Sequence, residues 1–371
     1  MKFKQNGFSL VEVLIILAIV ITIVVVGFVV YKKQIQKPTS LVPSNSLGSG
    51  FSTNGNTMNY LGKAFVPYGV TIYGLSQTTY QNSVASDINQ INAISNYWHG
   101  NTVRIQIAPD LYNSQTSSFN ADLNKEVIVA RDDNLNIIIS AQYERTNKIA
   151  GPDSSTTQFW KSISQNYAND PYVWFDLFNE PRYNCPGNSL PTSSCWNVWK
   201  NGNSNFVGMQ ALVNSIRSNA PNNLILAEGL AGGKTLDGID KYLLNGSNIV
   251  YSVHPYFGSL NRTQTQWDSN FGTISSKIPV IVGEWGQYET TRGSCVTNAP
   301  ILVPEFMSYL KSHNIGLIAW TLQPGNMIRG NNLENPTSFD NGVTYQCTKN
   351  TNNPNAQGSG TDIRNLFLSV P

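Results

Sequence analysis

The chain has 371 residues and a mass of 40.9 kDa, which excludes a small disulfide-stapled scaffold and allows one large domain with a sizeable core. Only 12% of the residues are charged, the formal net charge is +2, and no cluster of Lys or Arg is longer than a pair, so a nucleic-acid-binding surface is not expected. Asparagine is common and aromatic residues reach 11%, which predicts a neutral, polar surface with many rings.

The first 33 residues contain a long apolar segment. The uncharged run at residues 13–31 is about long enough to cross a bilayer as a helix, at roughly 1.5 Å per residue. Residues 1–33 are therefore predicted to be a leader followed by a single transmembrane helix. Two lysines stand on each side of the run, so the charges leave its orientation open. An uncleaved signal anchor is one interpretation of this segment.

The residues ahead of the apolar run carry a more specific pattern. A short basic leader ends at Gly7 and Phe8, and Glu12 stands fifth counting from Phe8. This resembles the type IV prepilin signal, which implies cleavage after Gly7, methylation of Phe8 and a helix that stays attached. A lone Glu is costly inside lipid, and in that family it pairs with the terminal amine of a neighbouring subunit. The resemblance implies a type IV pilus or secretion machinery as a partner, although no pilin-like head follows.

Residues 34–59 are rich in Ser, Asn, Thr, Gly and Pro. Such a composition buries too little apolar surface to offset the entropy lost on ordering, so a flexible linker is predicted. The folded domain is expected to run from residue 60 to residue 371, without an internal repeat or a second domain boundary.

Eight short apolar runs recur along this domain: VPYGVTIYG, TVRIQIAP, NIIISAQYE, VWFDLFNE, NLILAEG, IVYSVHPY, PVIVGEWG and GLIAWTLQ. Runs this apolar are typical of strands buried on both faces. Helix-like segments lie between them, for example at residues 86–97, 157–168, 206–218 and 303–313, and residues 361–369 form a candidate closing helix. The eight alternations predict an α/β protein with a (β/α)8 TIM barrel, and a doubly wound parallel sheet is the alternative.

Polar side chains end several of these runs. Glu180 ends the fourth run in FNEP, and Glu284 lies near the end of the seventh in GEWG. The carboxyl ends of barrel strands meet at one mouth, so two carboxylates on separate strands are candidates for chemistry as well as for structural pairing. Other candidates at similar positions are Arg104, His254, Tyr256 and Trp320.

The motifs NTVRI, FDLFNEP, HPY, GEWG and AW follow one another in this order from about residue 60 to the C-terminus. FNEP followed by GEWG about a hundred residues later is the specific part of the pattern. The pattern resembles glycoside hydrolase family 5, the cellulase-like family of clan A barrels. The resemblance implies that Glu180 is the general acid/base and Glu284 the nucleophile.

The same resemblance implies roles for the residues around this pair. Asn179 would bind the sugar 2-hydroxyl, and Arg104 would hold Glu284 ionised. His254 and Tyr256 would orient the pair of carboxylates. Trp320 would form a stacking floor for the sugar.

Two further residues are candidates for substrate binding. Trp285 directly follows the proposed nucleophile, where it can serve as a sugar platform or as a core aromatic. Members of the family often carry a His at the end of the third strand, whereas this chain has Gln142 there. We interpret Gln142 as a neutral hydrogen-bonding replacement, and this departure leaves open which glycan the neighbouring subsite binds.

Two carboxylates about 5–5.5 Å apart suit a double displacement. One attacks the anomeric carbon while the other, with a raised pKa, protonates the leaving oxygen and later activates water. The inferred outcome is retention of configuration. No metal or organic cofactor is expected, because the three His residues are scattered and no HExxH motif occurs.

The four cysteines lie in loop-like sequence, and no CxxC pair is present. Two disulfides are therefore favoured over a zinc site, which fits an oxidising compartment outside the cytoplasm. The pairing Cys185–Cys195 with Cys295–Cys347 is a hypothesis, because four cysteines allow three connectivities.

These observations predict a membrane-anchored, cell-surface glycoside hydrolase that acts on a β-linked polysaccharide, with an endo-β-1,4-glucanase as the first expectation. A neutral surface rich in amides and rings suits carbohydrate. The alternatives are a β-mannanase, a β-1,3-glucanase, a transglycosylase, and a noncatalytic glycan-binding adhesin or minor pilin.

Overall fold

The computed structural model describes residues 50–75, 84–142, 151–183, 185, 191–287, 296–339, 345, 347 and 356–369. The chain forms two units, Met1–Leu47 and Gly48–Pro371, and all described residues belong to the second.

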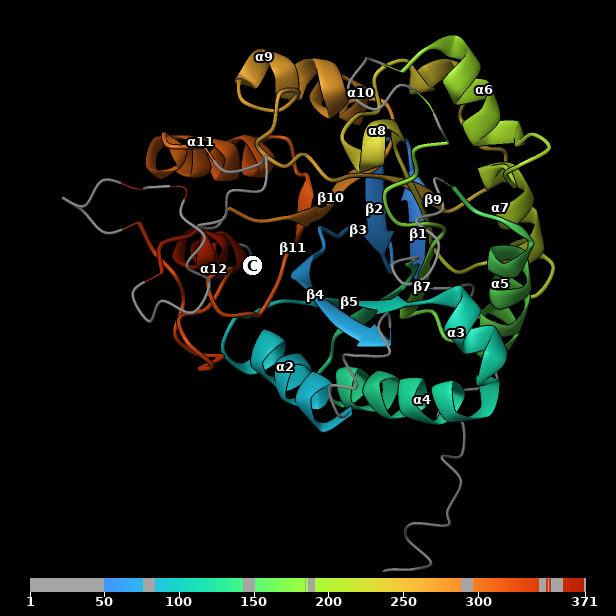
Figure 1. The fold of residues 1–371 in the computed structure, drawn as a ribbon, viewed down its shortest axis with the longest axis horizontal. Helices are drawn as coiled ribbons and strands as arrows, with labels where there is room; N and C mark the ends of the chain where they lie inside the picture. The colour runs from blue at the N-terminus through green and yellow to red at the C-terminus, as the bar shows by residue number, and fades with distance from the viewer. Residues whose placement is uncertain are drawn as a thin grey trace, which may run out of the picture. The chain divides into compact units, whose positions relative to one another are not determined.

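The second unit is built around a closed barrel of parallel strands (Figure 1). The strands are β4 (Tyr68–Leu75), β5 (Thr102–Ile107), β6 (Asn136–Ala141), β7 (Val173–Asp176), β8 (Ile225–Glu228), β9 (Ile249–Val253), β10 (Val280–Trp285) and β11 (Gly316–Ala319). Each strand pairs with the next one along the chain, and β11 closes the barrel against β4. The closed order confirms the predicted (β/α)8 barrel and rules out a doubly wound sheet.

The strands are buried on both faces, as their apolar sequences predict. Every residue of β5 to β11 is buried. Side chains alternate along each strand between the barrel interior and the surrounding helices. In β6, Ile138 belongs to an interior cluster with Trp174, whereas Ile137 and Ile139 belong to the larger core that includes the helices. This alternation decides which polar residues reach the site.

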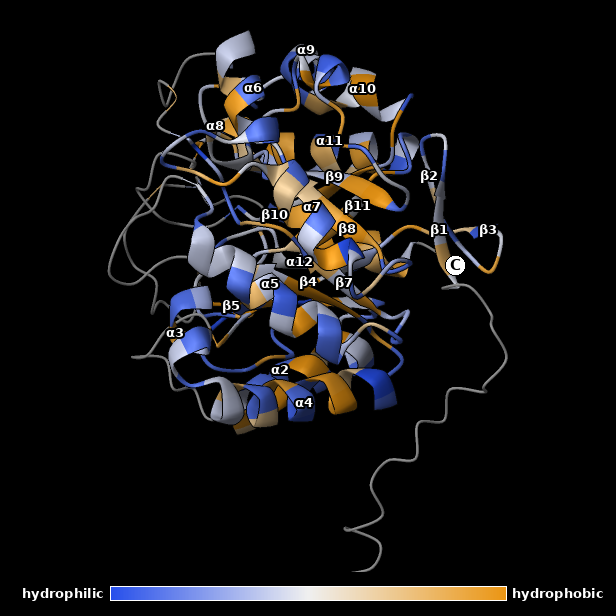
Figure 2. Ribbon diagram, turned by 90° about the vertical axis from the view of Figure 1, so that its right-hand side faces the viewer, coloured by the Kyte–Doolittle hydropathy of each residue, from blue (hydrophilic) through white to orange (hydrophobic). Residues whose placement is uncertain are grey.

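Helices encircle the barrel (Figure 1), and their apolar sides face the strands (Figure 2). The longer ones are α2 (Val84–Asn96), α4 (Thr116–Asp132), α5 (Ser154–Asn166), α6 (Ser193–Asn201), α7 (Met209–Arg217), α11 (Ala299–Ser312) and α12 (Gly360–Leu368). Shorter ones are α3 (Pro109–Ser114), α8 (Leu230–Gly233), η1 (Ile239–Lys241), α9 (Gln264–Trp267), η2 (Asp268–Gly272) and α10 (Thr273–Ser275). The helix α5 begins with a capping box, in which Asp153 accepts from the Thr156 amide and Thr156 accepts from the Asp153 amide.

A small antiparallel sheet precedes the barrel: β1 (Phe51–Asn54), β2 (Thr57–Tyr60) and β3 (Lys63–Ala64). Phe51 and Met58 pack into the interior cluster, and the Tyr60 hydroxyl lies 2.7 Å from that of Tyr172, just before β7. The sheet thus covers the amino end of the barrel (Figure 2). The structured domain starts before the expected residue 60, because these apolar side chains anchor a segment whose overall composition reads as linker.

The predicted leader, the transmembrane helix and most of the predicted linker lie outside the described residues. Within the described part of the chain, no helix has both the length and the apolar character needed to cross a bilayer. The disulfide Cys185–Cys195 is present as predicted. Cys347 is also disulfide-bonded, and its proposed partner Cys295 lies outside the described residues.

Candidate active site

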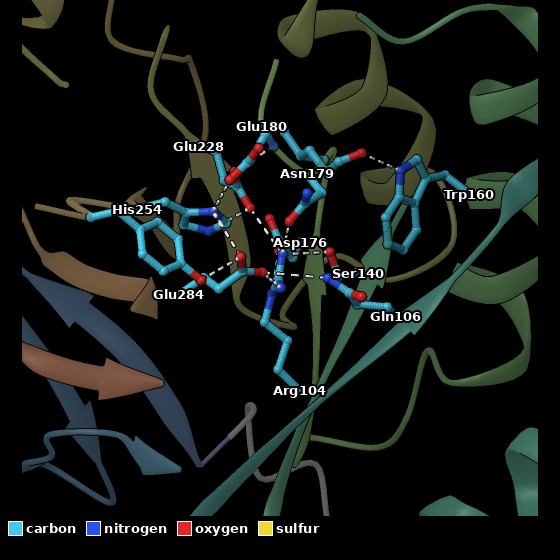
Figure 3. A network of polar contacts seen from close by, with 12 residues as sticks. Arg104, Gln106, Ser140, Trp160, Asp176, Asn179, Glu180, Glu228, His254 and Glu284 are labelled. Carbon is cyan, nitrogen blue, oxygen red and sulfur yellow. Dashed lines mark hydrogen bonds and ion pairs between the residues drawn. The ribbon is translucent and has the colours of Figure 1, made fainter. Parts of the chain in front are cut away.

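Arg104 lies at the centre of a buried polar cluster at the carboxyl end of the barrel (Figure 3). It stands in the middle of β5, not at its end, and its long side chain reaches up to the mouth. Its donors reach Asp176 Oδ2 (2.9 and 2.8 Å), Glu284 Oε2 (3.0 Å), Ser140 Oγ (2.8 Å), Asn179 Oδ1 (2.7 Å) and Glu228 Oε1 (3.0 Å). Burial acts to lower the pKa of this guanidinium, but the three carboxylates raise it above its ordinary value, so Arg104 stays charged.

Glu284 is held in β10 by three donors. Its Oε1 accepts from the Tyr256 hydroxyl at 2.9 Å. Its Oε2 accepts from Arg104 at 3.0 Å and from the Gln106 amide at 3.4 Å. The side chain is 7% exposed. Three donors on one carboxylate favour its ionised form, and they aim its oxygens at a fixed place.

Glu180 follows β7 and is the more open of the two carboxylates, with 31% of its side chain exposed. Its backbone has φ 49°, which is the left-handed region that non-glycine residues rarely adopt. The Glu180 amide donates to Glu228 Oε2 at 2.7 Å, and its carboxylate lies 3.4 Å from His254 Nδ1. Because the tip of Glu180 faces the mouth, it can reach both a leaving group and an incoming water.

The two proposed catalytic carboxylates face each other across the mouth (Figure 3). One oxygen of Glu180, one of Glu284 and a ring nitrogen of His254 all lie within 4.8 Å of one another. This spacing matches the ~5–5.5 Å of retaining glycosidases and is too short for the ~6.5–9.5 Å of inverting ones. The separation therefore supports the sequence-based assignment of both residues.

The same three side chains are spaced as metal ligands would be. The electrostatics disfavour a cation there. Burial acts to lower the pKa of His254, but Glu228 and Glu284 raise it to about 10. A ring that carries both protons at neutral pH has no free nitrogen to offer a metal.

The two carboxyls titrate as a pair. Burial raises the pKa of Glu284 to about 7, against the opposing charges of His254 and Arg104. Burial also acts to raise the pKa of Glu180, but the hydrogen bond and charge of His254 outweigh it and lower that pKa. These directions place the shared proton on Glu284, whereas the three donors around Glu284 favour its ionised form. We therefore assign the proton to the pair as a whole. The two roles are distinguished by position, because Glu284 lies deep in the site and Glu180 lies at its opening.

The remaining predicted substrate-binding residues mostly line the mouth. Trp320 follows β11, is partly exposed, and packs edge-on against Tyr73 with ring centroids 4.9 Å apart. Asn179 is partly exposed beside Glu180. Gln142 follows β6 and is 5% exposed, and its backbone amide donates to Ile107 O. Trp320 with Tyr73 thus forms a partly exposed aromatic surface.

Trp285 is not placed as a sugar platform. Its side chain is 0% exposed and packs against Phe257 and Phe306, with centroids 5.1 and 4.9 Å away. Successive residues of a strand point to opposite faces, so Glu284 points into the barrel and Trp285 points out towards α11. The expectation that Trp285 binds substrate is therefore corrected.

Several partners of the site were not assigned to it from the sequence. Gln106 and Ser140 lie on β5 and β6 at positions from which they reach the cluster, and no motif marks them. Asp176 and Glu228 are the last residues of β7 and β8, and both bind Arg104. The register of neighbouring strands is the signal that connects three of them, because Gln106, Ser140 and Asp176 align with one another on β5, β6 and β7.

Comparison with known proteins agrees with this geometry. Endoglucanase Z of Dickeya dadantii (strain 3937) is 24% identical over 177 residues, covering 47% of this chain and 36% of that protein. An endoglucanase of Clostridium saccharobutylicum is 24% identical over 270 residues, covering 70% of this chain and 54% of that one. The chain thus spans from about a third to about half of these curated relatives.

Solved structures share the fold. A β-glucanase, SdGluc5_26A of Saccharophagus degradans, matches with a TM-score of 0.68 and 21% identity, over 87% of this chain and 94% of that one. The family described as Cellulase (glycosyl hydrolase family 5) matches residues 61–326, which is well over half of the sequence and contains both carboxylates. The chain therefore belongs to the cellulase family, glycosyl hydrolase family 5.

Proposed function

We propose that this protein is a retaining glycoside hydrolase that cleaves internal β-1,4 links of a glucan. The observation that carries the proposal is the pair Glu180 and Glu284, whose carboxylate oxygens approach within 4.8 Å at one barrel mouth. A pair this close leaves no room for a water between a general base and the anomeric carbon, so a carboxylate itself must attack.

In the first step Glu284 attacks the anomeric carbon while Glu180 gives its proton to the glycosidic oxygen. The carbon–oxygen bond to the leaving sugar breaks, and a covalent bond between the sugar and Glu284 forms. In the second step Glu180 takes a proton from water, the water oxygen attacks the same carbon, and the Glu284 carboxylate leaves. Two inversions give net retention. Arg104 and Tyr256 hold Glu284 in place throughout, since both donate to its oxygens.

The choice of a glucan rests on the relatives and on the aromatic surface at the mouth. Two curated relatives are named endoglucanases, and the S. degradans β-glucanase has been solved with cellotetraose. The exposed parts of Trp320 and Tyr73 suit the flat C–H faces of β-linked glucose. A β-mannanase, a β-1,3-glucanase and a transglycosylase use the same carboxylate pair and differ in subsites, so they are the outcomes to test against.

The test is a panel of β-1,4-glucan, β-1,3-glucan, mannan and xylan, assayed for reducing ends with the purified chain. We expect release from the β-1,4-glucan, with a rapid fall in viscosity because internal links are cut. Preference for another polysaccharide would change the proposed substrate but leave the proposed mechanism unchanged. Binding without any release of reducing ends would favour the noncatalytic adhesin.

We further propose that the domain is tethered at the cell surface by its N-terminal segment. The proposal is supported by the apolar run at residues 13–31 and by the prepilin-like pattern around Gly7, Phe8 and Glu12. The sheet β1–β3 covers the amino end of the barrel, so a tether ahead of Phe51 leaves the mouth at the other end. Mass spectrometry of the mature N-terminus should find methylated Phe8, and an intact Met1 would refute the prepilin interpretation.

A further inference from the structure

Glu228 ends β8 and is a fully buried carboxylate to which the hydrolytic steps assign no proton transfer. The three contacts of its carboxylate oxygens all go to residues of the site. Oε2 accepts from the backbone amide of Glu180 at 2.7 Å. Oε1 lies 3.1 Å from His254 Nε2 and 3.0 Å from Arg104 Nη2. Both oxygens are thus engaged with the groups that surround the proton donor (Figure 3).

We propose that Glu228 is the positioning residue of the proton donor: it fixes the left-handed backbone of Glu180 and holds the His254 ring so that Nδ1 faces the Glu180 carboxylate. It acts through these two residues and not on the sugar, because its side chain is 0% exposed.

The backbone of Glu180 needs such a support. A non-glycine residue at φ 49° is strained relative to an ordinary backbone conformation. The conformation persists only where surrounding contacts over-determine it. The 2.7 Å bond from the Glu180 amide to a carboxylate is a charge-assisted hydrogen bond, which is about twice as strong as a neutral one. It therefore offsets the strain at the residue whose side chain must cross to Glu284.

The ring of His254 needs a support of the same kind. It is fully buried, with Nε2 towards Glu228 and Nδ1 at 3.4 Å from Glu180 and 3.9 Å from Glu284. A carboxylate on one ring nitrogen fixes the orientation and protonation of the other. Without Glu228, Nε2 loses its carboxylate partner, and the ring is held less firmly with its Nδ1 N–H towards the proton donor.

A glycine after β8 leaves room for the contact between Glu228 and His254. Gly233 has φ +74°, and a Cβ there would lie 3.1 Å from His254 Cβ and 3.2 Å from Glu228 Oε2. The carbonyl of Gly233 also accepts from the His254 amide at 2.6 Å. The turn after β8 therefore closes around the Glu228–His254 pair, which argues that their contact is built into the fold.

The first test uses Glu228→Gln and two aryl β-cellobiosides, and it rests on the proposed function for its substrates. Dinitrophenolate leaves without a proton, whereas phenolate needs one from Glu180. We expect kcat/KM for the phenyl glycoside to fall at least tenfold more than kcat/KM for the dinitrophenyl glycoside. The ratio is taken within one preparation, so any inactive fraction cancels. Equal losses on both substrates would overturn the proposal.

Asp176→Asn is the matched control. Asp176 is a similarly buried carboxylate, and its hydrogen bonds go to Arg104 rather than to Glu180 or His254. It should lower both rates together, because Arg104 serves the nucleophile. If Asp176→Asn lowers kcat/KM for the phenyl glycoside relative to the dinitrophenyl glycoside as strongly as Glu228→Gln does, a role specific to the proton donor is refuted. Should Glu228→Gln not fold, Glu228→Asp is measured on the same two substrates, with the same criteria.

The second test needs no substrate and so separates this inference from the proposed function. NMR follows the protonation of the His254 ring against pH in the full chain and in Glu228→Gln. We expect the variant to lose the ring proton at least one pH unit lower than the wild type, because a carboxylate no longer faces Nε2. Identical titration curves would show that Glu228 does not hold the ring. If the wild type cleaves neither cellobioside, the proposed function fails while this titration still decides the role of Glu228.

Discussion

The stability of the domain is predicted to fall as the pH rises from about 4 to 7, because two acids are buried together between outer helices. Asp87 on α2 and Glu126 on α4 are both 0% exposed, and their helices pack side by side (Figure 1). The two side chains hydrogen-bond each other, and no nitrogen or hydroxyl donor reaches their oxygens within the described part of the chain. Two carboxyls can share a hydrogen bond only if one of them keeps its proton.

The magnitude follows from the pKa of Asp87. Burial raises it from 3.8 to about 7, and the bond to Glu126 opposes that rise only in part. Burial, together with the charges of Asp87 and Asp122, also raises the pKa of Glu126 well above its ordinary value. Between about pH 4 and 7 the folded state therefore binds more protons than the unfolded state, so stability falls with rising pH. Three units at 1.36 kcal/mol each give about 4 kcal/mol for Asp87 alone.

Asp87→Asn tests directly whether stability falls as the pH rises. An amide keeps the shape, carries no charge and can donate to Glu126, so we expect it to raise the free energy of unfolding above pH 7 by up to about 4 kcal/mol. At about 2 °C per kcal/mol for a domain of this size, Tm rises by about 8 °C, whereas at pH 4 it changes little. Thermal unfolding from pH 4 to 8 is the assay, and Asp240→Asn at an exposed position of η1 is the control, expected within about 0.5 kcal/mol of the wild type. Equal Tm changes at pH 4 and pH 8, or a variant less stable at pH 8, would contradict the reasoning.

Three further predictions concern the active site and the disulfide. Glu284→Gln keeps the shape but removes the nucleophile, so hydrolysis should fall roughly 10⁴-fold or more while calorimetry finds cellotetraose binding within a few-fold of the wild type. The kcat/KM of the wild type should decline as pH rises through about 7, because the carboxyl pair then loses the proton that reaches the leaving group; a flat profile from pH 6 to 8 would argue against it. Cys185→Ser opens a loop with a sequence separation of 10, which lowers stability by about 3 kcal/mol in the chain-entropy view and should appear as a lower Tm.

The barrel and the carboxylate pair were predictable because both depend on local sequence. Strands buried on both faces need runs of apolar residues, and such runs end abruptly where the chain leaves the barrel wall. A charged residue at that point, such as Glu180 after β7, must meet the other strand ends at one mouth. Closure of the barrel then converts a separation of about a hundred residues between Glu180 and Glu284 into a few ångströms.

The errors have physical causes of different kinds. The sequence associates Trp285 with the sugar because it adjoins Glu284, although alternation along β10 sends neighbours to opposite faces. The strands β1 and β2 lie in a stretch whose average composition is that of a linker, and only Phe51 and Met58 reveal the packing. Composition averages over a window, whereas burial is decided by single side chains.

The role of Glu228 could not be read from the sequence because it depends on charge balance in three dimensions. Four carboxyls, Asp176, Glu180, Glu228 and Glu284, surround two buried cations, Arg104 and His254. The cluster carries an excess of negative charge, which burial makes costly, so it binds a proton that no single residue owns. Removing the charge of Glu228 lowers that excess, and the carboxyl pair should then release its proton more easily. Glu228 thus contributes to the raised pKa of Glu284 from a position that is closed to the sugar.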